Sequence, residues 1–237
     1  MTIELKGQEY RYPTELKDIT LRQRIDFYHT YGKELDQQLK AIAEAGGDEH
    51  EYLLYQADSA IKHVAFYTGI DIEELRSEVS FLSVHSIYLT GAQMMQEEEK
   101  GMVLQPSYDY AGEKWVIAPP AVTPDSEITF NEFLTSFEII RQMQALGNGK
   151  WDALPYLCCI YLRKEGEPFN ESLVKGERMD LMMDLPMDIA LAVAFFLSSC
   201  LHTYASTLAS SSQPEAGEAL VQPATSSAGD GFPSSAT

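Results

Sequence analysis

The chain has little positive charge. Its 237 residues contain 17 Lys and Arg but 36 Asp and Glu, so the formal net charge is −19. A nucleic-acid-binding surface needs clustered Lys and Arg, and adhesion to anionic lipid needs them too. The composition therefore argues against both functions and favours an apolar or basic partner. A net charge this far from zero also favours solubility and discourages self-association.

Cysteine is scarce as well. Cys158, Cys159 and Cys200 are odd in number and two of them are adjacent, which does not fit a disulfide framework. Neighbouring residues of a helix lie roughly 100° apart around its axis, so Cys158 and Cys159 cannot hold one metal ion as a Cys-x-x-Cys pair does. Their apolar surroundings keep thiols protonated. We therefore expect buried, inert thiols and a reducing compartment.

Long hydrophobic runs are missing. The longest apolar run covers residues 189–201, which is short of the roughly 20 residues that a membrane-spanning helix needs. The first residues, MTIELKGQEYRYP, lack the basic region and the apolar region of a secretory signal peptide. The sequence predicts a cytoplasmic protein without a membrane segment.

Catalytic and cofactor motifs are also missing. The segment at 50–54 begins like a zinc-protease motif, but Leu54 stands where the second histidine belongs. The glycines at 147 and 149 follow a predicted helix and lack the third glycine of a dinucleotide-binding motif. The chain has no phosphate-binding loop and no Gly-x-Ser-x-Gly segment. We expect no catalytic residues, no cofactor and no metal site, and hence a protein that is not an enzyme.

The sequence is rich in the pattern of amphipathic helices. Apolar residues recur three and four positions apart behind helix-capping sequences at 20–23, 71–74 and 129–132. The alternation in the first twelve residues predicts a small N-terminal β-hairpin, and a second short hairpin is predicted near 108–118 with its turn at Ala111-Gly112. The predicted fold class is mainly α, with about seven helices, a small N-terminal β-hairpin and a short β-hairpin insert.

Some helix assignments make specific statements about burial. The second predicted helix places Leu54 on its buried face, and a third helix, running without a break from residue 71 to the acidic run near 97, places Leu82 and Leu89 on its own. The helix that holds the adjacent cysteines is predicted to end with Arg163 and Lys164 near its C-terminal dipole, followed by a glycine as the stop.

The elements divide the chain into four regions. The N-terminal hairpin and helices cover 1–96, a β- and Pro-rich insert covers 97–128, and a C-terminal helical region covers 129–208. A Ser/Ala-rich tail covers 209–237 and has few large apolar residues. Such a segment cannot bury enough surface to offset the entropy of ordering, so we expect it to be disordered or to depend on a partner.

Methionine is concentrated in the segment ERMDLMMDLPMD. Methionine fills irregular gaps in cores, but it is also frequent on surfaces that accept varied apolar partners. Both interpretations stay open. In the second, an apolar groove with an acidic rim binds helices that carry basic flanks. The predicted partner-binding residues are Met179, Met182, Met183, Met187 and Phe195.

Several segments together resemble a known family. IELKGQEYRYP leads into ITLRQRIDFYHTYG, and much later DALPYLCCIYLRKEGEPFNE precedes an Arg-containing helix and LPMDIALAVAFFL. In these segments the chain resembles the small tail assembly chaperones of tailed bacteriophages. Several of those proteins have a β-hairpin followed by helices, an aliphatic helix ending in Leu-Arg-x-Glu-Gly-Glu, and a Leu-Pro-x-Asp start to an apolar final helix.

The resemblance covers the first 45 residues and residues 150–205, whereas the insert and the length of the chain depart from that group. It implies a non-enzymatic helical protein that covers apolar segments of a long coiled-coil partner, the tape-measure protein, until the tail is assembled. The implied location is the cytoplasm of the host cell, with no nucleic acid and no membrane as partner. The alternative is a structural component of the virion, such as a neck or tail-junction protein.

Overall fold

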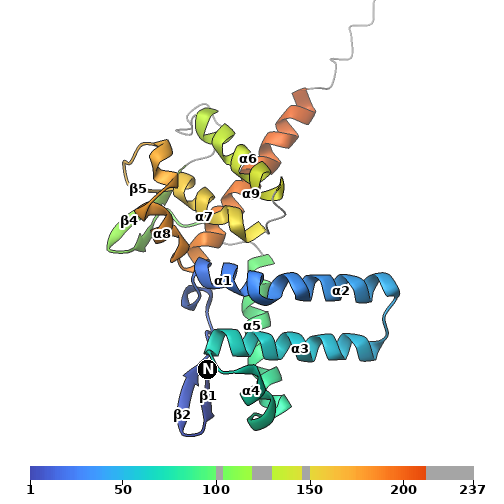
Figure 1. Cartoon of the computed structure of the whole chain (residues 1–237). Helices are drawn as coiled ribbons and strands as arrows, with labels where there is room; N and C mark the ends of the chain where they lie inside the picture. Colours follow the sequence, from blue (N-terminus) through green and yellow to red (C-terminus); the bar gives the residue numbers. More distant parts are fainter. Residues whose placement is uncertain (100–103, 119–129, 146–149, 212–237) are drawn as a thin grey trace, which may run out of the picture.

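The computed structural model describes residues 1–99, 104–118, 130–145 and 150–211 (Figure 1). Most of these residues lie in helices, and the strands form a two-stranded hairpin and a three-stranded sheet. The predicted fold class, mainly α with two small β elements, is confirmed. Thr129, which opens the predicted helix cap at 129–132, and the tail from residue 212 lie outside the described residues.

Short strands separate three runs of helices along the described chain. The N-terminal part holds β1 (Thr2–Leu5), β2 (Gln8–Arg11), the 3₁₀-helix η1 (Leu16–Asp18), α1 (Leu21–Phe27), the π-helical turn η2 (Tyr28–Gly32), α2 (Lys33–Ala45), α3 (Glu49–Thr68), α4 (Ile72–Glu78) and α5 (Phe81–Glu99). The C-terminal part holds β3 (Tyr108–Tyr110), β4 (Glu113–Ile117), α6 (Phe130–Ala145), α7 (Lys150–Tyr161), β5 (Leu162–Lys164), the 3₁₀-helix η3 (Glu171–Val174), α8 (Glu177–Met183) and α9 (Met187–Ser211).

The N-terminal hairpin forms as predicted. β1 and β2 pair antiparallel, with Leu5 opposite Gln8. The two residues between them, Lys6 and Gly7, both have positive φ (50° and 79°), which is the geometry that matches the twist of a two-residue hairpin. Ile3 and Leu5 are buried and their neighbours are exposed, so the hairpin covers the adjoining helices with one face.

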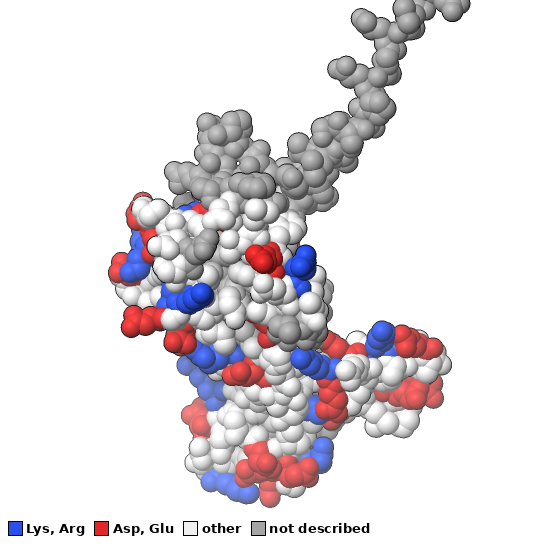
Figure 2. Space-filling view, turned by 45° about the horizontal axis from the view of Figure 1, so that its top comes forward, with Lys and Arg blue, Asp and Glu red and all other residues white. Residues whose placement is uncertain are grey.

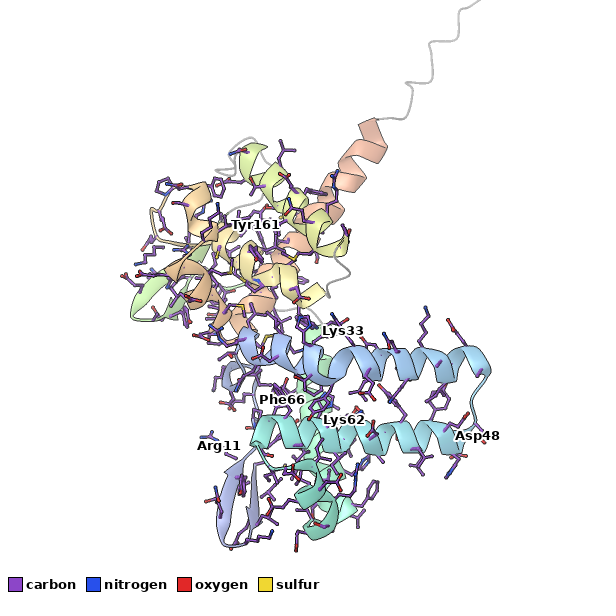
Figure 3. All side chains as sticks on the ribbon, in the orientation of Figure 1. Arg11, Lys33, Asp48, Lys62, Phe66 and Tyr161 are labelled. Carbon is purple, nitrogen blue, oxygen red and sulfur yellow. The ribbon has the colours of Figure 1, made fainter. Side chains whose placement is uncertain are left out.

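The helices α2 and α3 form a hairpin that projects from the rest of the molecule (Figure 1). Gly46 ends α2 in the left-handed conformation (φ 68°). Asp48 then caps α3, because its carboxylate accepts a hydrogen bond of 2.9 Å from the backbone N–H of Glu51. Figure 3 shows Asp48 at the tip of this hairpin. The local stop and start signals of the sequence therefore set the length of the projection.

The single long helix predicted from residue 71 is wrong, because the chain forms two helices there. Asp71 caps α4 as expected, but the helix ends after Glu78 and Val79 is extended (φ −111°, ψ 135°). The hydroxyl of Ser80 then accepts a hydrogen bond of 3.2 Å from the N–H of Ser83 at the start of α5. Serine favours this capping role over a helix interior, and the new start changes which side chains of α5 face the core.

The insert hairpin also forms, with Ala111 and Gly112 in its turn (φ 52° and 76°). It does not stand alone, because β4 pairs antiparallel with β5 and places Val116 opposite Arg163. The predicted helix C-terminus at Arg163 and Lys164 is therefore wrong. The free edge of β4 offers hydrogen bonds that end α7 at Tyr161 and continue the chain as a strand, and the glycine predicted as a stop lies in the turn that follows.

The described side chains form two hydrophobic cores. The C-terminal core lies between α1, the three-stranded sheet, α7, α8 and α9, and contains the fully buried Trp115. The N-terminal core lies between the β1–β2 hairpin, α3, α4 and α5. The helix α5 contributes to both, since Val84 and Ile87 belong to the N-terminal core and Met94 belongs to the C-terminal core.

Glycine at one position of α5 allows a close approach between segments. A Cβ atom at Gly91 would lie 2.1 Å from the hydroxyl oxygen of Tyr12 and 3.1 Å from its ring. Tyr12 is fully buried and packs edge-on against Tyr67 of α3, with ring centroids 6.2 Å apart. Because Gly91 has no side chain, Tyr12, which directly follows β2, can pack closely against α5.

Candidate protein-binding surfaces

The adjacent cysteines are buried, as predicted. Cys158 and Cys159 of α7 are inaccessible to solvent and free of disulfides. Burial raises the pKa of the Cys158 thiol well above its ordinary value and raises that of Cys159 to about 12. The half-buried thiol of Cys200 has a pKa of about 11 for the same reason. Neutral thiols are poor nucleophiles and poor metal ligands, so these residues act as packing.

The histidines do not converge on a site in the described part of the chain. His63 of α3 is packed between aromatic rings, with its ring centroid 4.2 Å from that of Phe27 and 5.3 Å from that of Tyr88. Its Nδ1 lies 2.9 Å from the carbonyl oxygen of Ser59. Burial lowers the pKa of His63 to about 4, so the ring is neutral at pH 7. Among the described residues, no group of three or more potential metal ligands comes together.

The methionine segment packs mainly into the C-terminal core. Met182 and Met187 are fully buried there, and Met179 and Met183 are partly buried against the same core. The prediction that Met182 and Met187 line an open groove is therefore wrong. The reason is long-range packing, because α8 lies against α7 and α1 and so turns the methionines inward. Phe195 of α9 is the predicted contact residue with the largest exposure, 40%.

The residues that carry the family resemblance also have structural roles. The guanidinium of Arg178 in α8 donates hydrogen bonds of 3.0 Å to the carboxylate of Glu167 and 2.8 Å to the carbonyl oxygen of Leu162. It lies 4.4 Å from the ring centre of Trp115. Glu167 belongs to the Leu-Arg-x-Glu-Gly-Glu segment, so a partly buried ion pair joins this segment to the Arg-containing helix and holds α8 against the sheet.

The Leu-Pro-x-Asp segment has a similar role at the start of α9. The carbonyl oxygen of Leu185 accepts a hydrogen bond of 2.9 Å from the N–H of Leu21, and the N–H of Met187 donates one of 2.9 Å to the carbonyl oxygen of Ile19. These two bonds form a short antiparallel bridge around Pro186. The segment therefore positions α9 against the beginning of α1.

Large apolar side chains are exposed on α3 and α5 of the N-terminal part, besides Leu39 on α2. Leu82 on α5 is 77% exposed and Leu54 on α3 is 57% exposed, although both were predicted to face the core. We call the group the acidic-end surface, for the charges around it. Its members are Leu53, Leu54, Phe81, Leu82 and Leu89.

The two helices that carry the acidic-end surface are packed on each other. The hydroxyl of Ser59 on α3 donates a hydrogen bond of 3.4 Å to the hydroxyl of Tyr88 on α5. On α5, Phe81 stacks on His85 with ring centroids 5.4 Å apart, and His85 lies 6.4 Å from Tyr88. A row of aromatic side chains therefore leads from the exposed start of α5 to the side of α3.

The surroundings of this surface are acidic. Residues 49–94 contain seven Asp and Glu but only two basic residues, Lys62 and Arg76, a net charge of −5. Both bases are already paired within this part, since Lys62 lies 2.7 Å from Asp58 and Arg76 lies 2.5 Å from Glu73. Figure 2 shows acidic side chains gathered on the α2–α3 hairpin and at the lower end of the molecule. The excess of carboxylates is therefore available to a basic partner.

A second exposed apolar group lies on α6 and α9, near the other end of the molecule. Leu134 and Phe137 of α6 and Phe195 of α9 are exposed. We call these three residues the neutral-end surface. Phe195 was predicted as a contact residue, but the methionines predicted with it lie in the core.

The acidic-end surface was missed because spacing along a helix shows that an apolar face exists, but not which face is covered. One signal in the sequence could have revealed it. Leu53 and Leu54 are adjacent, and so are Phe81 and Leu82. Because adjacent residues diverge by roughly 100°, the two members of such a pair rarely point into the same core.

A small cavity lies where η1 and α1 meet the end of the N-terminal hairpin. Its volume is about 250 Å³, and it is lined by Arg11, Pro13, Asp18, Gln23 and Tyr67. The side chains of Asp18 and Gln23 accept hydrogen bonds from backbone N–H groups at the starts of η1 and α1. Two of its polar groups are thus occupied in capping, and the volume is below that of ordinary ligand pockets, roughly 300–1,000 Å³.

Comparison of the chain with protein-family models, with curated proteins and with solved structures found no significant match. Within the residues that the structure describes, none of the helices has the length and apolar character needed to cross a bilayer. The function is therefore argued from the surfaces themselves.

Proposed function

We propose that this protein is a non-enzymatic tail assembly chaperone of a tailed bacteriophage, which binds apolar helical segments of a tape-measure protein in the host cytoplasm. The observation that supports it most is the acidic-end surface, where exposed apolar side chains on two packed helices lie among excess carboxylates. The resemblance of the hairpin, the Leu-Arg-Lys-Glu-Gly-Glu segment and the Leu-Pro-Met-Asp segment to that family supports it as well.

The apolar side chains supply the affinity. Leu82 and Leu89 are separated by seven residues, two helical turns, and so lie on one side of α5. A partner helix laid along that side would cover both, in the manner of helix-in-groove recognition. Full burial of a leucine contributes about 1.5–3 kcal/mol, and the half-exposed Leu89 contributes less than Leu82.

The carboxylates supply selectivity for basic flanks. Glu49 lies at the start of α3 and Glu78 at the end of α4, where Lys6 is already paired with Glu74 at 2.7 Å and interacts with Glu78 only electrostatically. Lysines or arginines of a partner can approach these positions without displacing an internal pair. Complementary charge raises the rate of encounter and excludes acidic competitors, which suits a protein that must hold one partner and release it.

The proposal is tested by measuring how well the protein binds a fragment of a tape-measure protein, with and without changes to the acidic-end surface. When the full chain is coexpressed with an apolar segment of a tape-measure protein, that segment should stay soluble. The variant Leu54→Asp/Leu82→Asp changes the two most exposed leucines of the surface, one on each helix, and should lower the affinity at least tenfold in a titration of the purified proteins.

The matched control is Leu134→Asp, which places the same new charge at an exposed leucine of α6 and should bind the fragment as the natural chain does. Circular dichroism checks that each variant is folded. Undiminished binding by the double variant would contradict the assigned surface. Mass spectrometry of purified virions tests the function itself, since defined copies in the finished particle would instead indicate a structural component.

A further inference from the structure

The neutral-end surface differs from the rest of the molecule in charge. In a chain of net charge −19, the stretch from Ile189 to Ser211 contains no Asp, Glu, Lys or Arg. This stretch is almost the whole of α9, and Figure 1 shows the helix projecting beyond the helices it packs on. Most of its described side chains up to Phe196 are buried in the C-terminal core, and those exposed to solvent, Phe195, Ser198 and Ser199, are uncharged. The exposed side of the described part of α9 therefore adds no charge to this end of the protein.

The helix α6 adds no net charge to this end. Its described part contains Glu132, Glu138 and Arg141. Glu132 is buried, with its carboxylate 3.1 Å from the guanidinium of Arg163 on β5. The exposed charges are then one acid, Glu138, and one base, Arg141, which cancel. The visible face of the C-terminal part in Figure 2 is accordingly mostly uncharged.

The two helices are held together through α7. The hydroxyl of Tyr161 accepts a hydrogen bond of 2.7 Å from Ser136 on α6, and its ring centroid lies 6.1 Å from that of Phe196 on α9. Tyr161 is buried in the C-terminal part (Figure 3). The residues next to these two contacts, Phe137 and Phe195, are exposed. Each helix therefore carries an exposed aromatic side chain next to a residue that contacts the buried Tyr161.

Charge determines what can cover each exposed surface. Two identical molecules related by a twofold axis present the same patch to each other, so the patch must be complementary to itself. A patch rich in carboxylates, such as the acidic-end surface, repels its own copy. A neutral patch of apolar side chains does not, and it is where two chains of charge −19 can approach with the least repulsion.

We propose that the neutral-end surface, formed by Leu134, Phe137 and Phe195, is the contact between two copies of this chain. The contact is isologous, places α9 of one copy near α6 or α9 of the other, and leaves both acidic-end surfaces free. It does not depend on the proposed chaperone function, because it concerns a different face and a different occupant.

The test is the mass of the full chain in reducing buffer, measured by sedimentation or by light scattering as the concentration is raised. The mass should rise from 26.5 kDa towards twice that value. Phe195→Asp and, on the other helix, Leu134→Asp should each weaken the dimer at least tenfold, because two new charges meet across the axis. Leu54→Asp at the acidic end should leave the dimer unchanged.

A chain that stays at the monomer mass at every concentration would overturn the proposal. A dimer that resists both Phe195→Asp and Leu134→Asp would overturn the assigned surface. If Phe195→Asp does not fold, Leu134→Asp alone decides, since Leu134 is 49% exposed and its helix is anchored by other residues. A natural chain that dimerises but does not bind the tape-measure fragment would count against the chaperone proposal alone.

Discussion

The acidic end and the neutral end both expose large apolar side chains, five at the first and three at the second, and we propose different partners for them. At the acidic end, leucines and a phenylalanine on α3 and α5 lie among carboxylates, and the few basic residues nearby are already in ion pairs. At the neutral end, the exposed apolar side chains of α6 and α9 have one exposed acid and one exposed base near them, Glu138 and Arg141 of α6. Apolar area alone would predict association anywhere. In the two proposals made above, the charge around the apolar side chains determines whether a basic helix or a second copy binds there.

The comparison of the two ends assumes that the methionine segment is part of the C-terminal core and does not form a third binding surface. Met182→Ser should lower the free energy of unfolding by roughly 3–5 kcal/mol, because it leaves a cavity and buries a hydroxyl. Urea unfolding followed by circular dichroism measures this loss. Met183→Ser is the matched control on the same helix, and because Met183 is only partly buried, its cost should be less than half as large.

If Met182→Ser leaves the stability unchanged and weakens binding of the tape-measure fragment, the methionines form a binding surface and the comparison of only two surfaces is wrong. The structure predicts the reverse, a less stable protein whose folded fraction binds the fragment normally.

The stability of the whole protein should depend on pH through His63, which is packed beneath the acidic end. Its pKa falls from 6.5 to about 4 on folding, so below pH 6.5 the unfolded chain binds a proton that the folded chain does not. Stability contributed by the neutral ring is complete above pH 6.5 and is lost as the pH falls towards 4, by about 3 kcal/mol over that window.

Urea unfolding at pH 7 and pH 4 measures this loss. Carboxylates titrate in the same range, so the quantity to compare is the difference between the natural chain and His63→Gln, whose side chain carries no titrating proton. The natural chain should lose about 3 kcal/mol more than the variant on acidification. Equal losses in the two proteins would show that His63 is not held neutral.

Salt gives the smallest effect and separates the two ends in a single experiment. Raising the ionic strength from about 0.1 M to about 1 M shortens the screening length from about 10 Å to about 3 Å. Binding of a basic-flanked helix at the acidic end should weaken by about tenfold, because it relies on opposite charges. Dimerisation at the neutral end should become tighter, because the repulsion between two acidic chains is screened.

Affinity measurements at both salt concentrations check this, with fluorescence anisotropy for the partner helix and sedimentation for the dimer. If both associations weaken together, the neutral end is held by charge and the distinction between the ends fails.

The parts of the fold that the sequence predicts correctly are those set by neighbouring residues. The first hairpin depends on alternation and on Gly7 in its turn, and the start of α1 depends on Thr20 and Gln23, whose side chains cap each other's backbone. The strand β5 was missed because Leu162 to Lys164 continue an apolar helical pattern. What converts them to a strand is β4, which lies far away along the chain.

The candidate site shows the same limit. Spacing correctly identified apolar faces on the helices, but packing decides which face is covered. Met182 was assigned to a surface and lies in a core, whereas Leu82 was assigned to a core and is the most exposed of the large apolar residues. Both outcomes depend on where a neighbouring helix lies, which residues three or four positions apart do not encode.

The position of α5 across both cores has a consequence for how the protein melts. Val84 and Ile87 at one end of the helix and Met94 at the other are buried in different cores, and Gly91 between them is closely covered by Tyr12. Neither core can lose its order without removing support from α5, and through α5 from the other core. We therefore expect the two halves to unfold together, in a single transition in place of two.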